Sequence, residues 1–231
     1  QNGGVTFDAF KVYTRPIRIV CVGDSITDGG HKGETFRKQE LDKEFSWPHE
    51  MNKLLGGGYM IFNCGQKGTT TDTYKSGDVY VFKTAKSEDA DIVINTLGYN
   101  DYGLKDFEAE SFKERFVYIM DEIKKTCTTT PRLYIGLTPF GTENTAKDSK
   151  RIDGVKALKE LSSEKNWPIV DFCSYMAPYR NTMYFPDGTH PYAYEANNMM
   201  TEIAAGQLPC AELCNPDDLK KVVENCSKKA E

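Results

Sequence analysis

Residues 17–28 read Ile-Arg-Ile-Val-Cys-Val-Gly-Asp-Ser-Ile-Thr-Asp. The first six form a short, β-branched and almost uninterrupted apolar run, which is typical of a strand buried on both faces of a parallel sheet. The run ends at Gly23-Asp24-Ser25. Open α/β sheets bind their ligands beyond the carboxyl ends of such strands, so Ser25 lies where a functional site is expected.

Ser25 has two interpretations. Gly-Asp-Ser is a common tripeptide, and a small polar residue after a strand is most often a turn residue or a helix N-cap. On a tight turn that leads into a helix, the hydroxyl could instead act as a nucleophile, provided that a base takes its proton. The chemical interpretation therefore depends on whether the rest of the chain supplies a base, a carboxylate to orient it and an oxyanion hole.

The chain contains three histidines from which a base could come. His49 lies in a predicted amphipathic helix over residues 46–55 and is expected to be a surface or packing residue. His31 and His190 each follow an aspartate by three positions. An aspartate that accepts a hydrogen bond from one ring nitrogen fixes the tautomer of the imidazole and stabilises its charged form.

The two Asp-x-x-His pairs differ in their surroundings. The pair at 28 and 31 lies in a long glycine-rich loop, where nothing evident holds the imidazole still. Pro186 and Pro191 flank the second pair and restrict the backbone around it. We therefore favour His190 as the base and Asp187 as its carboxylate partner.

Two later strand ends offer oxyanion donors. The apolar residues 59–62 are followed by Asn63-Cys-Gly-Gln-Lys-Gly68, and the predicted strand 91–97 is followed by Gly-Tyr-Asn100-Asp. Glycine lets a backbone N–H approach a substrate oxygen closely, and an asparagine amide can donate a further hydrogen bond to a developing oxyanion. Each of these residues taken alone is more often an ordinary turn residue.

In combination and in this order, four blocks of the chain resemble the GDSL or SGNH hydrolase family. The blocks are Gly23-Asp24-Ser25, Asn63-x-Gly65-x-x-Gly68, Gly98-x-Asn100-Asp101 and Asp187-x-x-His190. The resemblance spans residues 23–190, which is most of the chain. It implies an α/β fold in the form of a three-layer α/β/α sandwich, with a parallel, flavodoxin-like sheet of about five strands.

The resemblance also implies a role for each residue. Ser25 matches the family's nucleophile, and Asp187 and His190 match its acid and base. The backbone N–H groups of Ser25 and Gly68, together with the Asn100 side chain, match its oxyanion hole. The chain has no Gly-x-Ser-x-Gly motif, so it does not resemble the α/β-hydrolases of the lipase type.

Apolar periodicity along the chain agrees with this fold. Strands are expected near residues 17–22, 59–62, 91–97, 132–138 and 169–170, and helices near 46–55, 106–125, 149–164 and 191–206. Their alternation predicts a parallel sheet with helices on both faces. The 231 residues contain no repeat or linker, which favours one domain over residues 1–231 with a cysteine-containing tail at about 207–231.

The substrate class rests on a narrower resemblance. The segments 97–101 and 185–191 are similar to those of carbohydrate acetylesterases and sialate O-acetylesterase-like proteins. This resemblance implies a serine esterase for short acyl esters, acetyl esters above all, of a small molecule or a polysaccharide, with a carbohydrate as the expected alcohol. The polar loops 28–45, 69–76 and 141–150 contain no apolar run that could bury a long acyl chain. Four aromatic residues near the blocks either stack on sugar or pack in the core: Tyr74, Tyr99, Tyr102 and Phe185.

Three other functions remain open. They are a lipase-like or thioesterase-like acylhydrolase acting on longer chains, a non-catalytic flavodoxin-like module that cradles a phosphate at residues 23–30, and a non-catalytic carbohydrate-binding module. The flavodoxin-like interpretation leaves Asp187 and His190 without a role. A metal site at Asp28 and His31 lacks any recognised ligand spacing, so neither a metal nor a cofactor is expected.

Charge and hydropathy limit the partners. The net charge is −5 and no basic stripe is present, which disfavours nucleic-acid binding. No apolar run approaches the length of a membrane span. The chain begins at Gln1, which suits a terminus left by cleavage, and a polysaccharide substrate lies outside the cell; both favour a secreted or extracellular protein over a cytoplasmic one.

Five of the seven cysteines fall into two sets. Cys21 and Cys64 lie on or beside core strands and are expected to be small buried apolar residues. A second set lies in the tail, where two of its three members could form a disulfide: Cys210, Cys214 and Cys226. The odd total leaves at least one free thiol unless a cysteine pairs between chains.

Overall fold

The computed structural model describes residues 15–29, 46–76, 80–142, 144–181, 185, 187–191 and 194–208. The sequence predictions for His31, for most of the loop 28–45 and for the three tail cysteines lie outside these residues. Within them, no helix is both long and apolar enough to cross a lipid bilayer.

The described residues form a five-stranded parallel sheet. Its strands are β1 (Ile17–Gly23), β2 (Tyr59–Gly65), β3 (Ile92–Asn95), β4 (Arg132–Leu137) and β5 (Ile169–Asp171), arranged in the order β2-β1-β3-β4-β5. Every neighbouring pair is parallel. This confirms the predicted α/β class, and the strand order is that of flavodoxin-like folds.

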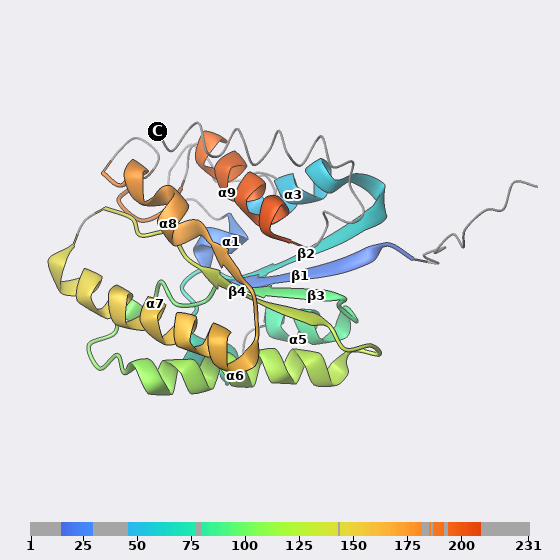
Figure 1. Cartoon of the computed structure of the whole chain (residues 1–231), viewed down its shortest axis with the longest axis horizontal. Helices are drawn as coiled ribbons and strands as arrows, with labels where there is room; N and C mark the ends of the chain where they lie inside the picture. Colours follow the sequence, from blue (N-terminus) through green and yellow to red (C-terminus); the bar gives the residue numbers. More distant parts are fainter. Residues whose placement is uncertain are drawn as a thin grey trace, which may run out of the picture.

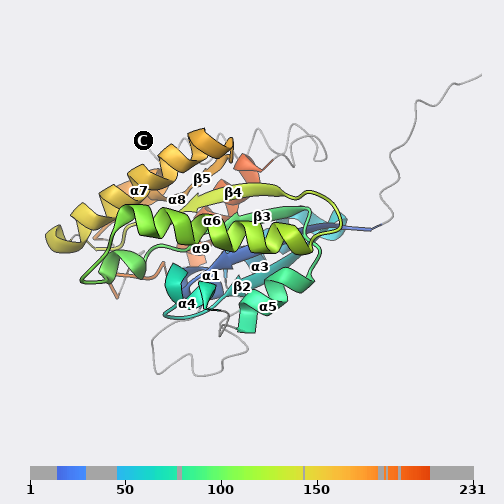
Figure 2. The same cartoon turned by 90° about the horizontal axis from the view of Figure 1, so that it is seen from below.

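Helices cover both faces of the sheet, as the alternation of elements predicts (Figures 1 and 2). One face carries α3 (Trp47–Leu55), α8 (Phe172–Met176) and α9 (Tyr194–Gln207). The other carries α4 (Thr71–Lys75), α5 (Tyr80–Ser87), α6 (Ala109–Thr126) and α7 (Thr145–Lys165). The short helix α1 (Ser25–Asp28) follows β1 directly.

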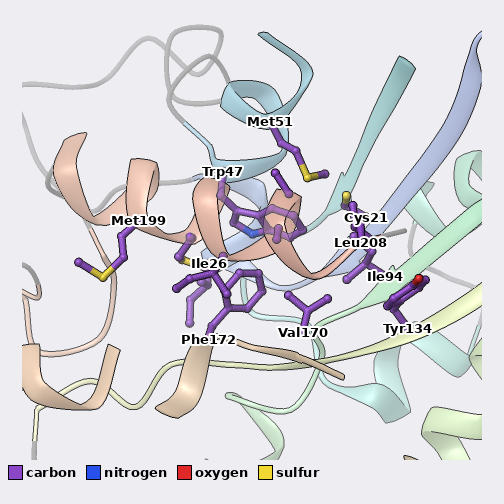
Figure 3. Close-up of a cluster of buried hydrophobic side chains, with 14 of the residues drawn as sticks. Cys21, Ile26, Trp47, Met51, Ile94, Tyr134, Val170, Phe172, Met199 and Leu208 are labelled. Atoms are coloured by element: carbon purple, nitrogen blue, oxygen red, sulfur yellow. The ribbon is translucent and has the colours of Figure 1, made fainter. Parts of the chain in front are cut away.

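Each face of the sheet has its own apolar core, because successive side chains of a strand point to opposite faces. In β1, Ile19 and Cys21 belong to one core while Val20 and Val22 belong to the other. Figure 3 shows the first core, where the rings of Trp47 and Phe172 lie 5.3 Å apart between their centroids. Cys21 and Cys64 are fully buried, which confirms that prediction.

The carboxyl ends of the strands meet at one edge of the sheet. Gly23 at the end of β1 pairs with Gly65 at the end of β2. Backbone bonds continue the pairing past the strands, since the Gln66 N–H donates to the Gly23 carbonyl at 3.0 Å and the Thr96 N–H donates to the Val22 carbonyl at 2.9 Å. The segments that follow β1, β2 and β3 are therefore neighbours.

Some boundaries differ from the sequence prediction. Helix α7 begins at Thr145 rather than at residue 149, because the Asn144 side chain accepts a hydrogen bond from the Lys147 N–H and caps the helix earlier. Helix α4 has no counterpart among the predicted elements. Its start is fixed by Thr70, which exchanges hydrogen bonds with Thr73 in a capping box that lacks the usual Glu or Gln.

Candidate active site

Ser25 lies on a tightly packed turn between β1 and α1. Gly23 has no room for a side chain there, since a Cβ atom would lie 2.2 Å from Thr27 Oγ1 and 2.4 Å from Thr96 Oγ1. These two hydroxyls are hydrogen-bonded to each other at 2.6 Å. The Asp24 carboxylate accepts from the Ile26 N–H at 3.0 Å and caps α1. The turn thus sets the position of Ser25 at the carboxyl edge of the sheet.

The structure brings Ser25, His190 and Asp187 together. The Ser25 Oγ lies 2.7 Å from His190 Nε2, and His190 Nδ1 lies 2.7 Å from Asp187 Oδ2. The second carboxylate oxygen, Asp187 Oδ1, accepts from the Thr189 and His190 backbone N–H groups at 2.9 and 2.8 Å. With its Nδ1 proton donated to the carboxylate, the imidazole presents Nε2 as an acceptor to the serine hydroxyl.

A neighbouring loop supports the segment that carries Asp187 and His190. Between these two residues lies Gly188, whose φ of +76° favours glycine. The Thr142 N–H donates to the Gly188 carbonyl at 2.8 Å. Gly141 approaches so closely that a Cβ atom on it would lie 2.2 Å from the Gly188 oxygen. Sequence reasoning missed Gly141, and only its place after β4 could have suggested a role.

Gly68 and Asn100, the predicted oxyanion donors, follow β2 and β3 at this same edge. Gly68 has a φ of +75°, and a Cβ atom there would have no neighbour within 4 Å, so its surroundings are open. The Asn100 Nδ2 donates to the Thr69 carbonyl at 2.9 Å. An amide nitrogen carries two protons, so this bond orients the group and leaves the second proton for another acceptor.

Asn63 and Gly65, in the second sequence block, have a structural role. The Asn63 Nδ2 donates to the Thr27 carbonyl at 2.8 Å and to Ser46 Oγ at 3.0 Å, which joins α1 to the start of α3. A Cβ atom on Gly65 would lie 2.3 Å from the Asp28 backbone nitrogen. These residues hold α1, and with it Ser25, against β2.

Two buried carboxyl groups adjoin the site residues Ser25 and Asn100 in the chain, and sequence reasoning gave them no role. Asp24 and Asp101 both have 0% exposure. Burial raises the pKa of Asp24 to about 7. The hydrogen bond from the Ile26 N–H lowers this pKa, and the nearby Asp101 charge raises it further, but burial has the largest effect. Burial likewise raises the pKa of Asp101 to about 6, although Thr71 donates to its carboxylate from both side chain and backbone.

Asp24→Asn is expected to change how stability depends on pH. The pKa of Asp24 in the folded chain, about 7, exceeds its ordinary value of 3.8, so this group's stabilising contribution is complete below about pH 4 and is lost as the pH rises through 7. Asparagine is neutral throughout and keeps the oxygen that accepts from Ile26. Relative to the variant, the wild type should lose up to roughly 1.4 kcal/mol of unfolding free energy per pH unit across that window.

Urea unfolding of both proteins at pH 5 and pH 8 measures this difference. The unfolding free energy of the variant, relative to that of the wild type, should be higher at pH 8 than at pH 5. A gap of the same size at both pH values would show that the pKa of Asp24 does not lie in this window.

The structure overturns the sugar-stacking interpretation of the four aromatic residues near the blocks. Tyr74, Tyr99, Tyr102 and Phe185 are all buried, with at most 9% exposure. Two of the hydroxyls have internal partners, because Tyr74 Oη donates to the Cys64 carbonyl at 3.0 Å and Tyr99 Oη accepts from Arg151 at 2.9 Å. Their polar ends thus need no solvent.

No group of three or more His, Cys, Asp or Glu residues in the described part of the chain could hold a metal ion.

Comparisons with known proteins give one matching family model and several similar folds. A family model described as "GDSL-like Lipase/Acylhydrolase family" matches residues 21–194. Similar solved structures include the aryl esterase of M. smegmatis, with 19% identity, a TM-score of 0.63 and coverage of 83% of this chain and 97% of that chain. The carbohydrate acetylesterase Est24 from Sinorhizobium meliloti has 18% identity, a TM-score of 0.61 and coverage of 82% and 99%.

A member of the lipolytic protein G-D-S-L family from Veillonella parvula DSM 2008 is also similar, at 19% identity and a TM-score of 0.62, with coverage of 81% of this chain and 96% of that chain. No curated protein matches the chain. At these identities the solved structures establish the fold alone, and the match over residues 21–194 establishes the family.

Proposed function

The chain belongs to the GDSL-like lipase/acylhydrolase family, and from this we propose that it is a serine esterase that hydrolyses short acyl esters, acetyl esters above all, of a carbohydrate alcohol. The observation that carries the proposal is the hydrogen-bonded series Ser25–His190–Asp187, with 2.7 Å at each of its two side-chain links. Such a series activates a serine hydroxyl, which is otherwise a weak nucleophile.

In the proposed reaction, His190 Nε2 takes the Ser25 proton as the serine oxygen attacks the ester carbonyl carbon. The tetrahedral intermediate collapses, the sugar alcohol leaves with the proton from His190, and the acyl group remains on Ser25. A water molecule then gives a proton to His190 and attacks the acyl carbon. The bond between the acyl carbon and the Ser25 oxygen breaks, the acid is released, and the Ser25 oxygen takes the proton from His190. Asp187 holds the imidazole in the tautomer that each step requires.

The developing oxyanion would be bound by three donors. They are the Ser25 and Gly68 backbone N–H groups and the second proton of the Asn100 amide. The Ser25 N–H belongs to the first turn of α1, where N–H groups have no acceptor within the helix. Loss of one oxyanion donor typically lowers kcat by about 10²–10³-fold.

Polar surroundings support a short acyl group. The large apolar side chains that are exposed in the described part of the chain are Leu54, Met60, Tyr80, Leu104, Tyr118, Ile152 and Tyr175. None of them belongs to the turn at Ser25 or to the segments 66–70, 97–101 and 187–191, which hold the proposed site. A site for a long acyl chain needs apolar surface to bury each methylene group, worth about 0.8 kcal/mol apiece.

Chain-length profiling tests the proposal. We expect kcat/KM for p-nitrophenyl esters to be highest with acetate and to fall toward octanoate, and we expect acetate release from acetylated xylan or an O-acetylated sialic acid. A lipase-like or thioesterase-like site would instead gain up to about fourfold per added methylene. A rate that climbs to octanoate, with no acetate released from any acetylated sugar, would contradict the acetyl-carbohydrate assignment.

A further inference from the structure

A cluster of three charged side chains lies beside the candidate site: Asp148 and Arg151 on α7, and Arg180 after α8. We refer to these three residues as the Asp148 cluster. Asp148 Oδ1 accepts from Arg151 Nη1 at 2.8 Å, and Asp148 Oδ2 accepts from Arg180 Nη2 at 2.9 Å. A single carboxylate thus binds two guanidinium groups that come from separate parts of the chain.

Arg151 connects the cluster to the segment after β3. Its Nη2 donates to Tyr99 Oη at 2.9 Å, and its guanidinium lies 4.8 Å from the centroid of the Tyr99 ring. Tyr99 is the residue directly before Asn100. Arg151 therefore fixes the side chain that adjoins the proposed oxyanion donor.

Arg180 connects the cluster to the loop after β4. Its Nε donates to the Gly141 carbonyl at 2.9 Å, and its guanidinium lies 5.5 Å from the centroid of the Phe140 ring. The Arg151 guanidinium lies at the same distance from that ring. Gly141 and Thr142 in turn contact Gly188, between Asp187 and His190. The cluster is thus linked to Asn100 through Tyr99, and to the loop that carries Asp187 and His190 through Gly141 and Gly188.

Stability alone does not account for such an arrangement. Arg151 has only 2% exposure, and its Nε has no hydrogen-bond partner among the described residues. Burying a charged group is unfavourable unless it is paired, and apolar side chains of similar volume would often fill the space at least as stably. The charged groups instead orient their neighbours, because a planar guanidinium group fixes the positions of the atoms that accept its hydrogen bonds.

We propose that the Asp148 cluster is a positioning unit that fixes the loop carrying Asp187 and His190 relative to the Tyr99–Asn100 segment. This inference rests on the proposed function. The three residues of the cluster act through Tyr99 and Gly141 and are positioning residues, not catalytic ones. Partial burial would raise the pKa of Asp148, but the hydrogen bonds from Arg180, Asn144 and Arg151 outweigh it and lower that pKa, so the carboxylate is ionised at neutral pH.

Asp148→Asn tests the proposal, because it keeps the size of the side chain and removes its charge. Displacement of a reacting group by about 1 Å can lower the rate by about 10²-fold, so we expect kcat to fall about 10–100-fold while KM changes less than about threefold. Arg180→Gln, at a side chain with 18% exposure, is a second variant that removes the bond to Gly141 with less disturbance of the core.

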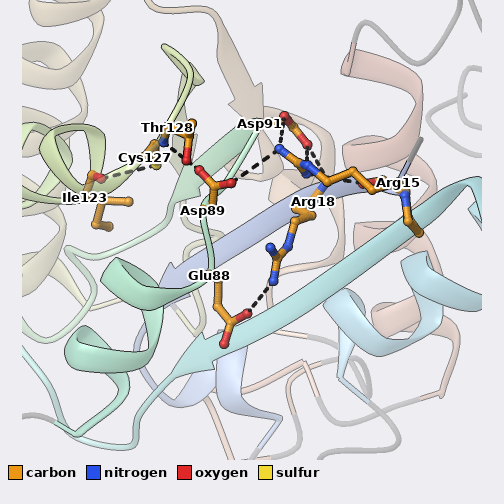
Figure 4. Close-up of polar contacts among 9 residues, drawn as sticks. Arg15, Arg18, Glu88, Asp89, Asp91, Ile123, Cys127 and Thr128 are labelled. Atoms are coloured by element: carbon orange, nitrogen blue, oxygen red, sulfur yellow. Dashed lines mark hydrogen bonds and ion pairs between the residues drawn. The ribbon is translucent and has the colours of Figure 1, made fainter. Parts of the chain in front are cut away.

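Asp91→Asn is the matched control. Asp91 accepts from Arg15 through both oxygens, at 2.7 and 3.0 Å, and from the Arg18 backbone N–H at 2.9 Å (Figure 4). It directly precedes β3 and so lies at the opposite end of that strand from the candidate site. Its side chain is 30% exposed, against 20% for Asp148. The two substitutions should lower Tm to a similar extent, but only Asp148→Asn should lower kcat.

The ¹⁵N spectrum of the histidine rings gives a readout that needs no ester turnover. The full chain has three histidines, and His190→Asn identifies the His190 signal. The wild type and Asp91→Asn should show a single tautomer protonated on Nδ1, whereas Asp148→Asn and Arg180→Gln should show mixed tautomers. If the wild type hydrolyses no ester, the proposed function is overturned. The histidine spectrum then still tests the positioning role, because it does not depend on ester turnover. An unchanged His190 spectrum in both cluster variants, or an equal loss of kcat in Asp91→Asn, overturns the inference.

Discussion

Ser25→Ala is expected to abolish ester hydrolysis and leave the fold unchanged. The Ser25 hydroxyl would form the covalent acyl-enzyme, and its oxygen lies 2.7 Å from the His190 Nε2 atom that would take its proton. Removal of the nucleophile in a comparable triad lowers kcat by about 10⁶-fold, so the expected loss here is on the order of 10⁵-fold or more. Steady-state assays with p-nitrophenyl acetate measure it.

The fold should survive because the turn does not depend on this hydroxyl. The Asp24 cap on α1 and the bond between Thr27 and Thr96 remain in the variant. Circular dichroism and Tm should therefore match those of the wild type. Ser163→Ala is a suitable control, since Ser163 is an exposed serine on α7 whose hydroxyl donates to the Lys159 carbonyl, and it should keep full activity.

A serine-reactive phosphonate gives an independent test of the same residue. It should label the wild type and Ser163→Ala, and it should not label Ser25→Ala. Near-normal turnover by a folded Ser25→Ala protein would remove Ser25 from the mechanism. Failure of the wild type both to react with the probe and to hydrolyse any ester would favour the alternative of a non-catalytic carbohydrate-binding module.

The sheet could be predicted from the sequence because its strands are buried on both faces. A strand such as β1 must then be β-branched and apolar along its length, and this pattern is visible without knowledge of its neighbours. The polar residues after β1, β2 and β3 are also predictable as neighbours, since parallel strands place their carboxyl ends at one edge. The same rule predicts that Ser25, Gly68 and Asn100 share that edge.

The remaining features depend on contacts that no local pattern reports. Ser25 and His190 are separated by 165 positions in the chain, and only tertiary packing places their side chains 2.7 Å apart. The close approach of Gly141 to Gly188 has the same origin. Short helices such as α4 were missed because five residues are too few to show a helical period, and their stability comes from caps and packing.

The burial of the tyrosines has a related cause. A tyrosine beside a predicted site is equally consistent with a ligand-stacking surface and with a core position, because its ring is apolar and its hydroxyl is polar. Tyr99 and Tyr74 are core residues here because Arg151 and the Cys64 carbonyl satisfy their hydroxyls. Those partners lie 52 and 10 positions away, and the sequence alone does not pair them.

His190→Ala is expected to have the second large effect, and its comparison with His31→Ala decides between the two Asp-x-x-His pairs. If His190 is the base, its loss should lower kcat by several orders of magnitude, comparable to the loss of the serine. His31 lies outside the described residues, and His31→Ala should retain most of the wild-type kcat. His49→Ala is the matched control, because His49 is a partly buried histidine on α3 with no place in the proposed chemistry.

Two further measurements make the choice of His190 specific. Asp187→Asn keeps the size of the side chain but leaves the imidazole in the wrong tautomer, and in a comparable triad such a change lowers kcat by about 10⁴-fold. Activity of the wild type should also fall on the acidic side of its pH profile, because a protonated imidazole cannot accept the Ser25 proton. If His31→Ala lost more activity than His190→Ala, the base would belong to the Asp28–His31 pair. The 2.7 Å contact between Ser25 and His190 would then be a resting arrangement that the reaction does not use.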